Sequence, residues 1–64
     1  MLTHREMDVL KLVAQGKPNK TIARELGISL ATTKEHFMNI YDKLGVQSRL
    51  ELLIKAIKEG LVKV

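Results

Sequence analysis

Apolar positions recur with a helical period along the chain. Counted from Thr33, the positions 4, 7, 8 and 11 residues further on hold Phe37, Ile40, Tyr41 and Leu44, which places these side chains on one face of an α-helix. Similar stripes lie before and after this stretch, and no run alternates apolar and polar residues as a β-strand does. The pattern therefore predicts an all-α, compact four-helix domain with helices over residues 4–15, 19–26, 30–44 and 49–59.

Residues that begin and end helices lie at the borders of these four stretches. Thr3 and Glu6 have the spacing of a capping box before the first helix, and Ser48 and Glu51 have it before the last. Ser29 is suited to cap the third helix. Each predicted helix is followed by a glycine, at a position where a left-handed residue is common: Gly16, Gly27, Gly45 and Gly60. This agreement of caps, period and terminators strengthens the four-helix prediction.

The stretch from residue 19 to residue 44 has the plan of a helix-turn-helix. A short helix ends at Gly27, Ile28 fills the space between the helices, and Ser29 opens a longer second helix. Pro18 suits a helix entry, and Asn19 would cap the short helix if it started one residue later. In this plan the second helix lies in the major groove of DNA.

The outward face of the 30–44 helix is polar and partly cationic. Lys34, Glu35 and Met38 lie opposite the apolar stripe near the helix start, where a groove-bound helix meets base edges. The lysine can donate to guanine, the glutamate can accept from cytosine, and the methionine can touch a thymine methyl group. Polar residues on the flanks of this face would meet phosphates. An ordinary solvated surface is the alternative interpretation of the same residues.

The last predicted helix has more apolar surface than one small core can use. Leu52 and Ala56 form one stripe, and a wider stripe lies beside it. The excess is either core or a surface for a partner, and the second interpretation predicts a homodimer formed by antiparallel pairing of this helix with its twin. The predicted dimer interface consists of Leu50, Leu53, Ile54 and Ile57.

Composition narrows the function further. The 64 residues suffice for one domain, and the net charge of +4 favours a polyanionic partner, although ordinary solubility charge explains it too. Cysteine is absent, which fits a reducing compartment such as the cytoplasm. No apolar run reaches the ~20 residues that a membrane helix needs. His4 and His36 lack a third ligand at helical spacing, so we expect the chain to bind no metal. No catalytic constellation stands out either, so we expect that the chain needs no cofactor and is not an enzyme.

The order of many residues resembles the LuxR-type helix-turn-helix domain of quorum-sensing regulators and NarL/FixJ-type response regulators. The resemblance covers essentially the whole chain. It rests on Leu2-Thr3-x-Arg5-Glu6-x-x-Val9-Leu10, Gly16, Asn19-Lys20, Ile22-Ala23, Leu26, Ile28-Ser29, Thr32, Lys34, His36, Asn39-Ile40, Lys43-Leu44-Gly45-Val46, Ser48-Arg49 and Gly60-Leu61-Val62.

The resemblance implies a bacterial transcription-factor domain that binds double-stranded DNA as a dimer. Helix 30–44 would enter the major groove, helix 49–59 would dimerise, and Lys34, Glu35 and Met38 would face the bases. It also implies that an N-terminal receiver or ligand-binding domain controls this one. We therefore expect residues 1–64 to be a single domain excised from the C-terminus of a longer regulator, with a free-standing small regulator as the alternative. The implied contacts to the DNA backbone are Asn19, Lys20, Thr32, His36 and Lys43.

Three departures from the family pattern affect the predicted structure. Thr33 replaces a usual valine, and its hydroxyl can bond back to a carbonyl one turn earlier. The usual capping box before the second helix is lost at Pro18 and Thr21. Leu52 replaces a usual alanine, which either fills a gap or alters the dimer surface. Arg49 is expected to bond within the domain and to hold the loop before the last helix.

A helical protein-interaction module without DNA binding is the alternative function. Such a module would use the apolar surface of helix 49–59. It has no need for the cationic, capped face between Lys34 and Lys43, which carries no large apolar residue except Met38. That face is the feature that separates the two functions and favours DNA.

Overall fold

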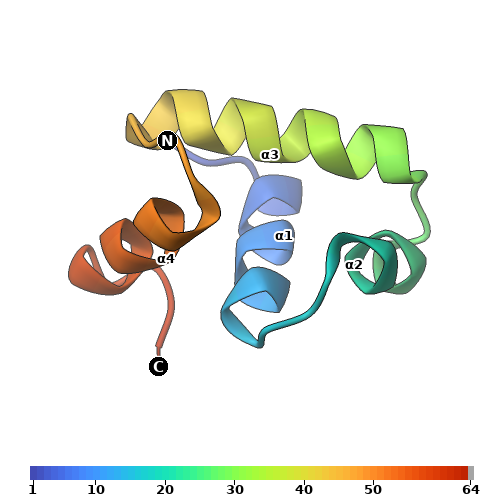
Figure 1. Ribbon diagram of the computed structural model, residues 1–64, viewed down its shortest axis with the longest axis horizontal. Helices are drawn as coiled ribbons and strands as arrows, with labels where there is room; N and C mark the ends of the chain where they lie inside the picture. Colours follow the sequence, from blue (N-terminus) through green and yellow to red (C-terminus); the bar gives the residue numbers. More distant parts are fainter. Residues whose placement is uncertain (64) are drawn as a thin grey trace.

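The computed structural model describes residues 1–63 and folds them into four helices, as predicted. They are α1 (His4–Ala14), α2 (Asn19–Leu26), α3 (Leu30–Leu44) and α4 (Arg49–Lys58). Two of them end one residue earlier than predicted, because Gln15 and Glu59 form their C-caps. No strand is present in this part of the chain. Helix α3 spans the molecule, and the other three helices lie on one side of it (Figure 1).

The capping residues act at three of the four helix starts. Thr3 and Glu6 form the predicted capping box, with N–H to side-chain oxygen distances of 3.1 and 2.9 Å. Ser48 accepts from the Glu51 N–H at 3.1 Å, but the Glu51 carboxylate accepts from Gln47 and not from Ser48. The second predicted capping box is therefore only half formed. The backbone explains it, since Ser48 is more extended than Thr3, with φ of −146° against −74°.

Helix α2 starts at residue 19, as predicted, so the alternative in which Asn19 caps a helix that starts one residue later does not apply. Pro18 occupies the N-cap position and offers no side-chain hydrogen bond, so α2 begins at Asn19. The Asn19 side chain therefore does not cap this helix. The turn between α2 and α3 follows the helix-turn-helix plan, since Gly27 ends α2 in the left-handed region at φ 68° and Ser29 caps α3 by accepting from the Thr32 N–H.

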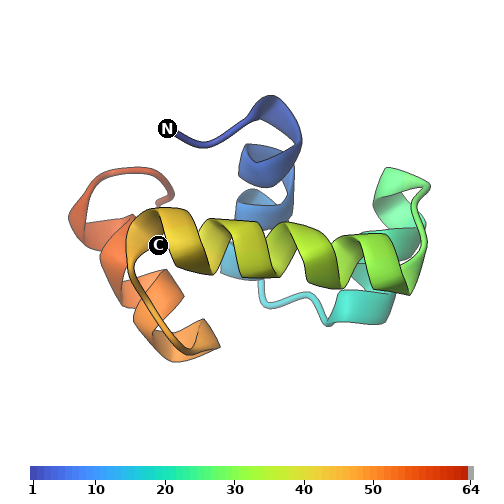
Figure 2. The same cartoon turned by 90° about the horizontal axis from the view of Figure 1, so that it is seen from above.

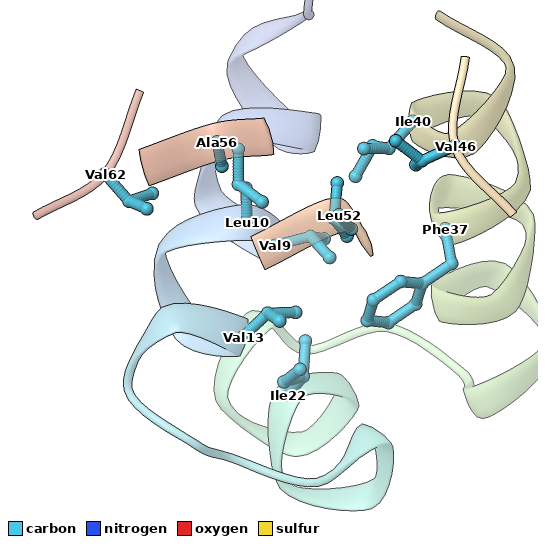
Figure 3. Packing of buried hydrophobic residues seen from close by; sticks show 10 residues of the cluster. All are labelled: Val9, Leu10, Val13, Ile22, Phe37, Ile40, Val46, Leu52, Ala56 and Val62. Carbon is cyan, nitrogen blue, oxygen red and sulfur yellow. The ribbon is translucent and has the colours of Figure 1, made fainter. Parts of the chain in front are cut away.

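The core lies where α1, α2 and α4 meet the inner face of α3. Figure 3 shows its side chains converging from all four helices and from the segments after α3 and α4. Thr33 is fully buried among them, and its hydroxyl donates to the Ser29 carbonyl at 3.0 Å, as predicted. Leu52 and Ala56 provide the core face of α4. In the view from above, α3 crosses in front of the other helices and leaves its outer face free (Figure 2).

The helices within residues 1–63 include none with the length and apolar character that a membrane span requires.

Candidate nucleic-acid interface

The outer face of α3 presents the three predicted base-facing side chains to solvent. Lys34 and Glu35 are exposed, and Met38 is 67% exposed although it is apolar. Thr33 and Phe37, their neighbours in sequence, point into the core, so packing fixes which way this face looks. Neither Lys34 nor Glu35 forms an ion pair with any residue from 1 to 63. Both charges are thus available to a partner.

The start of α3 is fixed by a small hydroxyl network. Ser29 Oγ accepts from the Thr32 N–H and donates to Thr32 Oγ1, each at 3.0 Å. The Thr32 hydroxyl keeps its own hydrogen for a further acceptor, because it is used here only as an acceptor. His36, one turn further along α3, is half-buried. Thr32 and His36 are both half-buried, and their contacts to phosphates stay a prediction.

Two residues of the candidate interface, Asn19 and Lys20, lie at the start of α2. Lys20 is exposed in the first turn, and no ion pair holds it within the described chain. Lys17, just before α2, is instead paired with Glu25 at 2.6 Å. Helices α2 and α3 pack on each other, so the cation of Lys20 belongs to the same rigid helix-turn-helix unit as Lys34.

Lys43 has a partner inside the domain. Its Nζ lies 2.8 Å from Oε1 of Glu6, whose side chain is only 5% exposed. The Lys43 hydrogen bond, followed by the bond from the Thr3 backbone, lowers the pKa of Glu6 below its usual range, against the opposing effect of burial. Lys43 therefore ties the end of α3 to the start of α1. Sequence analysis missed this pair. Its one signal in the sequence is Glu6 itself, a carboxylate in the first turn of α1 that becomes buried and therefore needs a partner.

Arg49 also bonds within the domain, as predicted, but to a different segment. Its Nη1 donates to Asn19 Oδ1 at 2.8 Å, and its Nη2 donates to the Lys17 carbonyl at 2.6 Å. The guanidinium also lies over the Phe37 ring, 5.3 Å from its centroid. The loop that Arg49 holds is thus the one before α2, and the prediction of the loop before α4 was wrong. Arg49 is the first residue of α4, and its long side chain reaches across to α2.

Three large apolar side chains of α4 are exposed to solvent. Leu50 is 68% exposed, Ile54 51% and Ile57 42%, whereas Leu53 is partly buried and packs against the core. These residues match the wider stripe predicted as a dimer interface, and Leu52 and Ala56 alone supply the fully buried positions of α4. Residues 1–63 hold no group of three or more side chains able to bind a metal ion.

A short helix, a glycine turn and a capped helix with a free polar face define a helix-turn-helix protein. A model of the family described as bacterial regulatory proteins, luxR family, matches residues 1–56. The chain is 49% identical over 60 residues to the nitrate/nitrite response regulator NarL of Escherichia coli (strain K12), a match that covers 94% of this chain and 28% of NarL.

Two solved structures have the same fold. The transcription factor GerE superposes with a TM-score of 0.89 at 31% identity, over 97% of this chain and 92% of GerE. The LuxR-type receptor VqmA of Vibrio cholerae gives a TM-score of 0.93 at 35% identity, over 98% of this chain and 29% of VqmA. The chain belongs to the luxR family of bacterial regulatory proteins, and it is a LuxR-type DNA-binding domain of a transcription regulator. The predicted resemblance is confirmed.

Proposed function

We propose that this domain recognises specific double-stranded DNA sequences with α3 docked in the major groove. The observation that carries the proposal is the outer face of α3, where Lys34, Glu35 and Met38 stand exposed together and without partners within residues 1–63. A lysine can donate, a glutamate can accept and a methionine can make apolar contacts. This face therefore favours a partner that offers acceptors, donors and methyl groups. The base edges of the major groove offer all three.

Contacts to phosphates would position this helix on the duplex. We assign them to Asn19, Lys20, Thr32 and His36, which surround the exposed face and carry hydrogen-bond donors or positive charge. Lys43 is kept as a proposed phosphate contact, but its charge is already shared with Glu6. We therefore expect Lys43 to attract a DNA phosphate less strongly than the unpaired Lys20 does.

A second copy of the domain would bind through α4. The exposed side chains of Leu50, Ile54 and Ile57 form an apolar strip that a twin helix can cover, with Leu53 at its edge. VqmA, a relative in fold, is described as a dimer that has a target DNA. By analogy, two copies of this domain would bind an inverted repeat.

The domain would act as the effector part of a larger cytoplasmic regulator. This chain spans 28% of the length of NarL and 29% of VqmA, so most of each of those proteins lies outside the matched part. We propose that a receiver or ligand-binding domain, preceding residues 1–64 in the full regulator, controls access of α3 to DNA.

Selection of binding sites from random duplex DNA tests this function. The selected pool is bound again at two salt concentrations, because the salt dependence measures how many phosphates the protein neutralises. We expect enrichment of one inverted repeat. Enrichment of no sequence, together with weak binding that salt abolishes, would show that the basic face is only electrostatic. The apolar surface of α4 would then become the candidate functional surface.

A further inference from the structure

The bonds of Arg49 determine how the Asn19 side chain is oriented. A guanidinium carries donors only, so the branch of the Asn19 amide that faces Arg49 must be its carbonyl oxygen. The Nδ2 branch, with two N–H donors, then points away from Arg49. It has no hydrogen-bond partner among residues 1–63, and no side-chain nitrogen or oxygen there is both buried and unpaired. The two N–H donors are therefore open to solvent.

Three contacts hold Arg49 in this position. The fork of its guanidinium spans Asn19 and the Lys17 carbonyl, and its face rests on the nearly buried Phe37 ring. Lys17 is itself fixed to Glu25 of α2 by an ion pair of 2.6 Å. The segment before α2 is thus held from both sides, and Asn19 is followed in the first turn of α2 by the unpaired Lys20.

We propose that Arg49 is a positioning residue for DNA binding, which holds the Asn19 amide with its NH₂ group free to donate to a DNA phosphate. The proposal rests on the proposed function, because a phosphate at the start of α2 requires DNA docked on α3. It gives Arg49 no contact with DNA: the guanidinium uses its fork on Asn19 and Lys17. Arg49, the first residue of α4, thereby orients the Asn19 donors at the start of α2 and connects α4 to the helix-turn-helix unit.

A double-mutant cycle tests whether Arg49 acts through Asn19. The variants are Asn19→Ala, Arg49→Met and their combination, where methionine keeps an apolar contact with Phe37 and removes the donors. Dissociation constants are measured on the selected duplex and on unrelated DNA at several salt concentrations. We expect each single variant to bind every sequence about three- to tenfold more weakly, as for one lost hydrogen bond. The double variant should bind no more weakly than the weaker single one.

The salt dependence separates positioning from direct contact. A neutral amide releases no counterion, so the slope of log affinity against log salt should stay unchanged in all three variants. Additive losses, with a slope reduced by about one for Arg49→Met, would mean that Arg49 touches phosphate itself and would overturn the proposal. Wild-type affinity of Asn19→Ala would also overturn it, while leaving recognition by α3 intact. A folded wild-type chain that binds no duplex would refute the proposed function instead.

Asn19→Asp provides a test that does not depend on Arg49 variants folding. The carboxylate can accept the same Nη1–H of Arg49 that Asn19 Oδ1 accepts, while Nη2 keeps its bond to the Lys17 carbonyl, so the free energy of unfolding in urea should not fall. The donor branch becomes an anionic acceptor, so DNA affinity should fall more than about tenfold on every sequence. Gln15→Glu is the matched control, since it adds the same charge at the end of α1 that lies away from α3 (Figure 1). Equal affinities of the two variants would overturn the proposal.

Discussion

Lys34 and Lys20 are both exposed, unpaired lysines, but the proposed interface gives them different partners. Replacing Lys34 with alanine should cost ~1–3 kcal/mol of binding free energy on the selected site and relax the base preference at one position, because a base-edge contact is lost. Lys20→Ala is the matched control, which should weaken all sequences alike and reduce the salt slope by about one. Fluorescence titrations on matched and mismatched duplexes measure both. An equal loss on every sequence for Lys34→Ala would show that this side chain touches only phosphate.

Lys43 should affect stability more than DNA binding. Lys43→Met removes the cation that is bonded to the nearly buried Glu6, and we expect the free energy of unfolding to fall by about 1.5–3 kcal/mol, the range for hydrogen bonds to charged groups. The salt slope of DNA binding should change less than in Lys20→Ala. Urea unfolding and DNA titration on the same sample separate the two effects. A stable variant with a slope reduced by about one would instead make Lys43 a phosphate contact.

The Glu6–Lys43 pair also predicts acid sensitivity. The folded protein lowers the pKa of Glu6 below its ordinary value of 4.5, so around and below that pH the unfolded chain binds the proton more readily. The stability that this ionised carboxylate contributes is present above pH 4.5 and is lost as the pH falls through the lower folded pKa. Urea unfolding followed by circular dichroism should show this decline in the wild type and a smaller one in Glu6→Gln. Parallel pH profiles for the two would contradict the assignment.

At the scale of elements, the helices were predictable because their signals are local. Thr3, Ser29 and the terminal glycines act within one turn of the helix that they begin or end, and the period of α3 lies within a single stretch. The bonds between elements were not predictable in this way. Glu6 meets Lys43 across 37 residues, and Asn19 meets Arg49 across 30. Only the packing of helices brings such pairs together. Sequence analysis therefore missed that the Asn19 side chain accepts a hydrogen bond from Arg49.

Helix α4 shows the same limit for apolar residues. Its two stripes are adjacent, and sequence alone left open which one the core would take. In the structure the core contains Leu52 and Ala56, which are fully buried, while Ile54 and Ile57 remain on the surface. The leucine that replaces the family's usual alanine at position 52 therefore fills the core and does not alter the surface of α4. The exposed face of α3 was predictable because its buried stripe is unambiguous.

The two stripes of α4 should respond differently to a negative charge. Ile54→Asp changes an exposed position, so the domain should stay folded while dimer formation and tight binding to the inverted repeat are lost. Leu52→Asp would bury an unpaired carboxylate and should prevent folding. Sedimentation velocity together with circular dichroism reports association and folding for each variant. A folded Ile54→Asp variant with undiminished association would refute the α4 interface.

On the scale of the whole molecule, one domain presents only a short recognition surface. Helix α3 has 15 residues, of which the proposed base contacts occupy one face near its start, so a single copy would read one short half-site. Two copies joined through α4, as proposed, would make the second binding event effectively intramolecular, which would raise affinity without any new contact to DNA. In the proposed dimer, the apolar strip on α4 and the polar face on α3 would act together, and the dimer geometry would fix the distance between half-sites.

The proposed dimer predicts a strict dependence on half-site spacing. The wild type should bind the selected repeat at least about tenfold more tightly than a duplex with one half-site scrambled. Inserting about five base pairs, half a helical turn, should remove that advantage, because it turns one half-site to the opposite side of the duplex. Ile54→Asp serves as the control: it should bind the intact, scrambled and respaced duplexes equally well. If the wild type is indifferent to spacing, then its two copies bind independently, and the specificity of the domain resides in α3 alone.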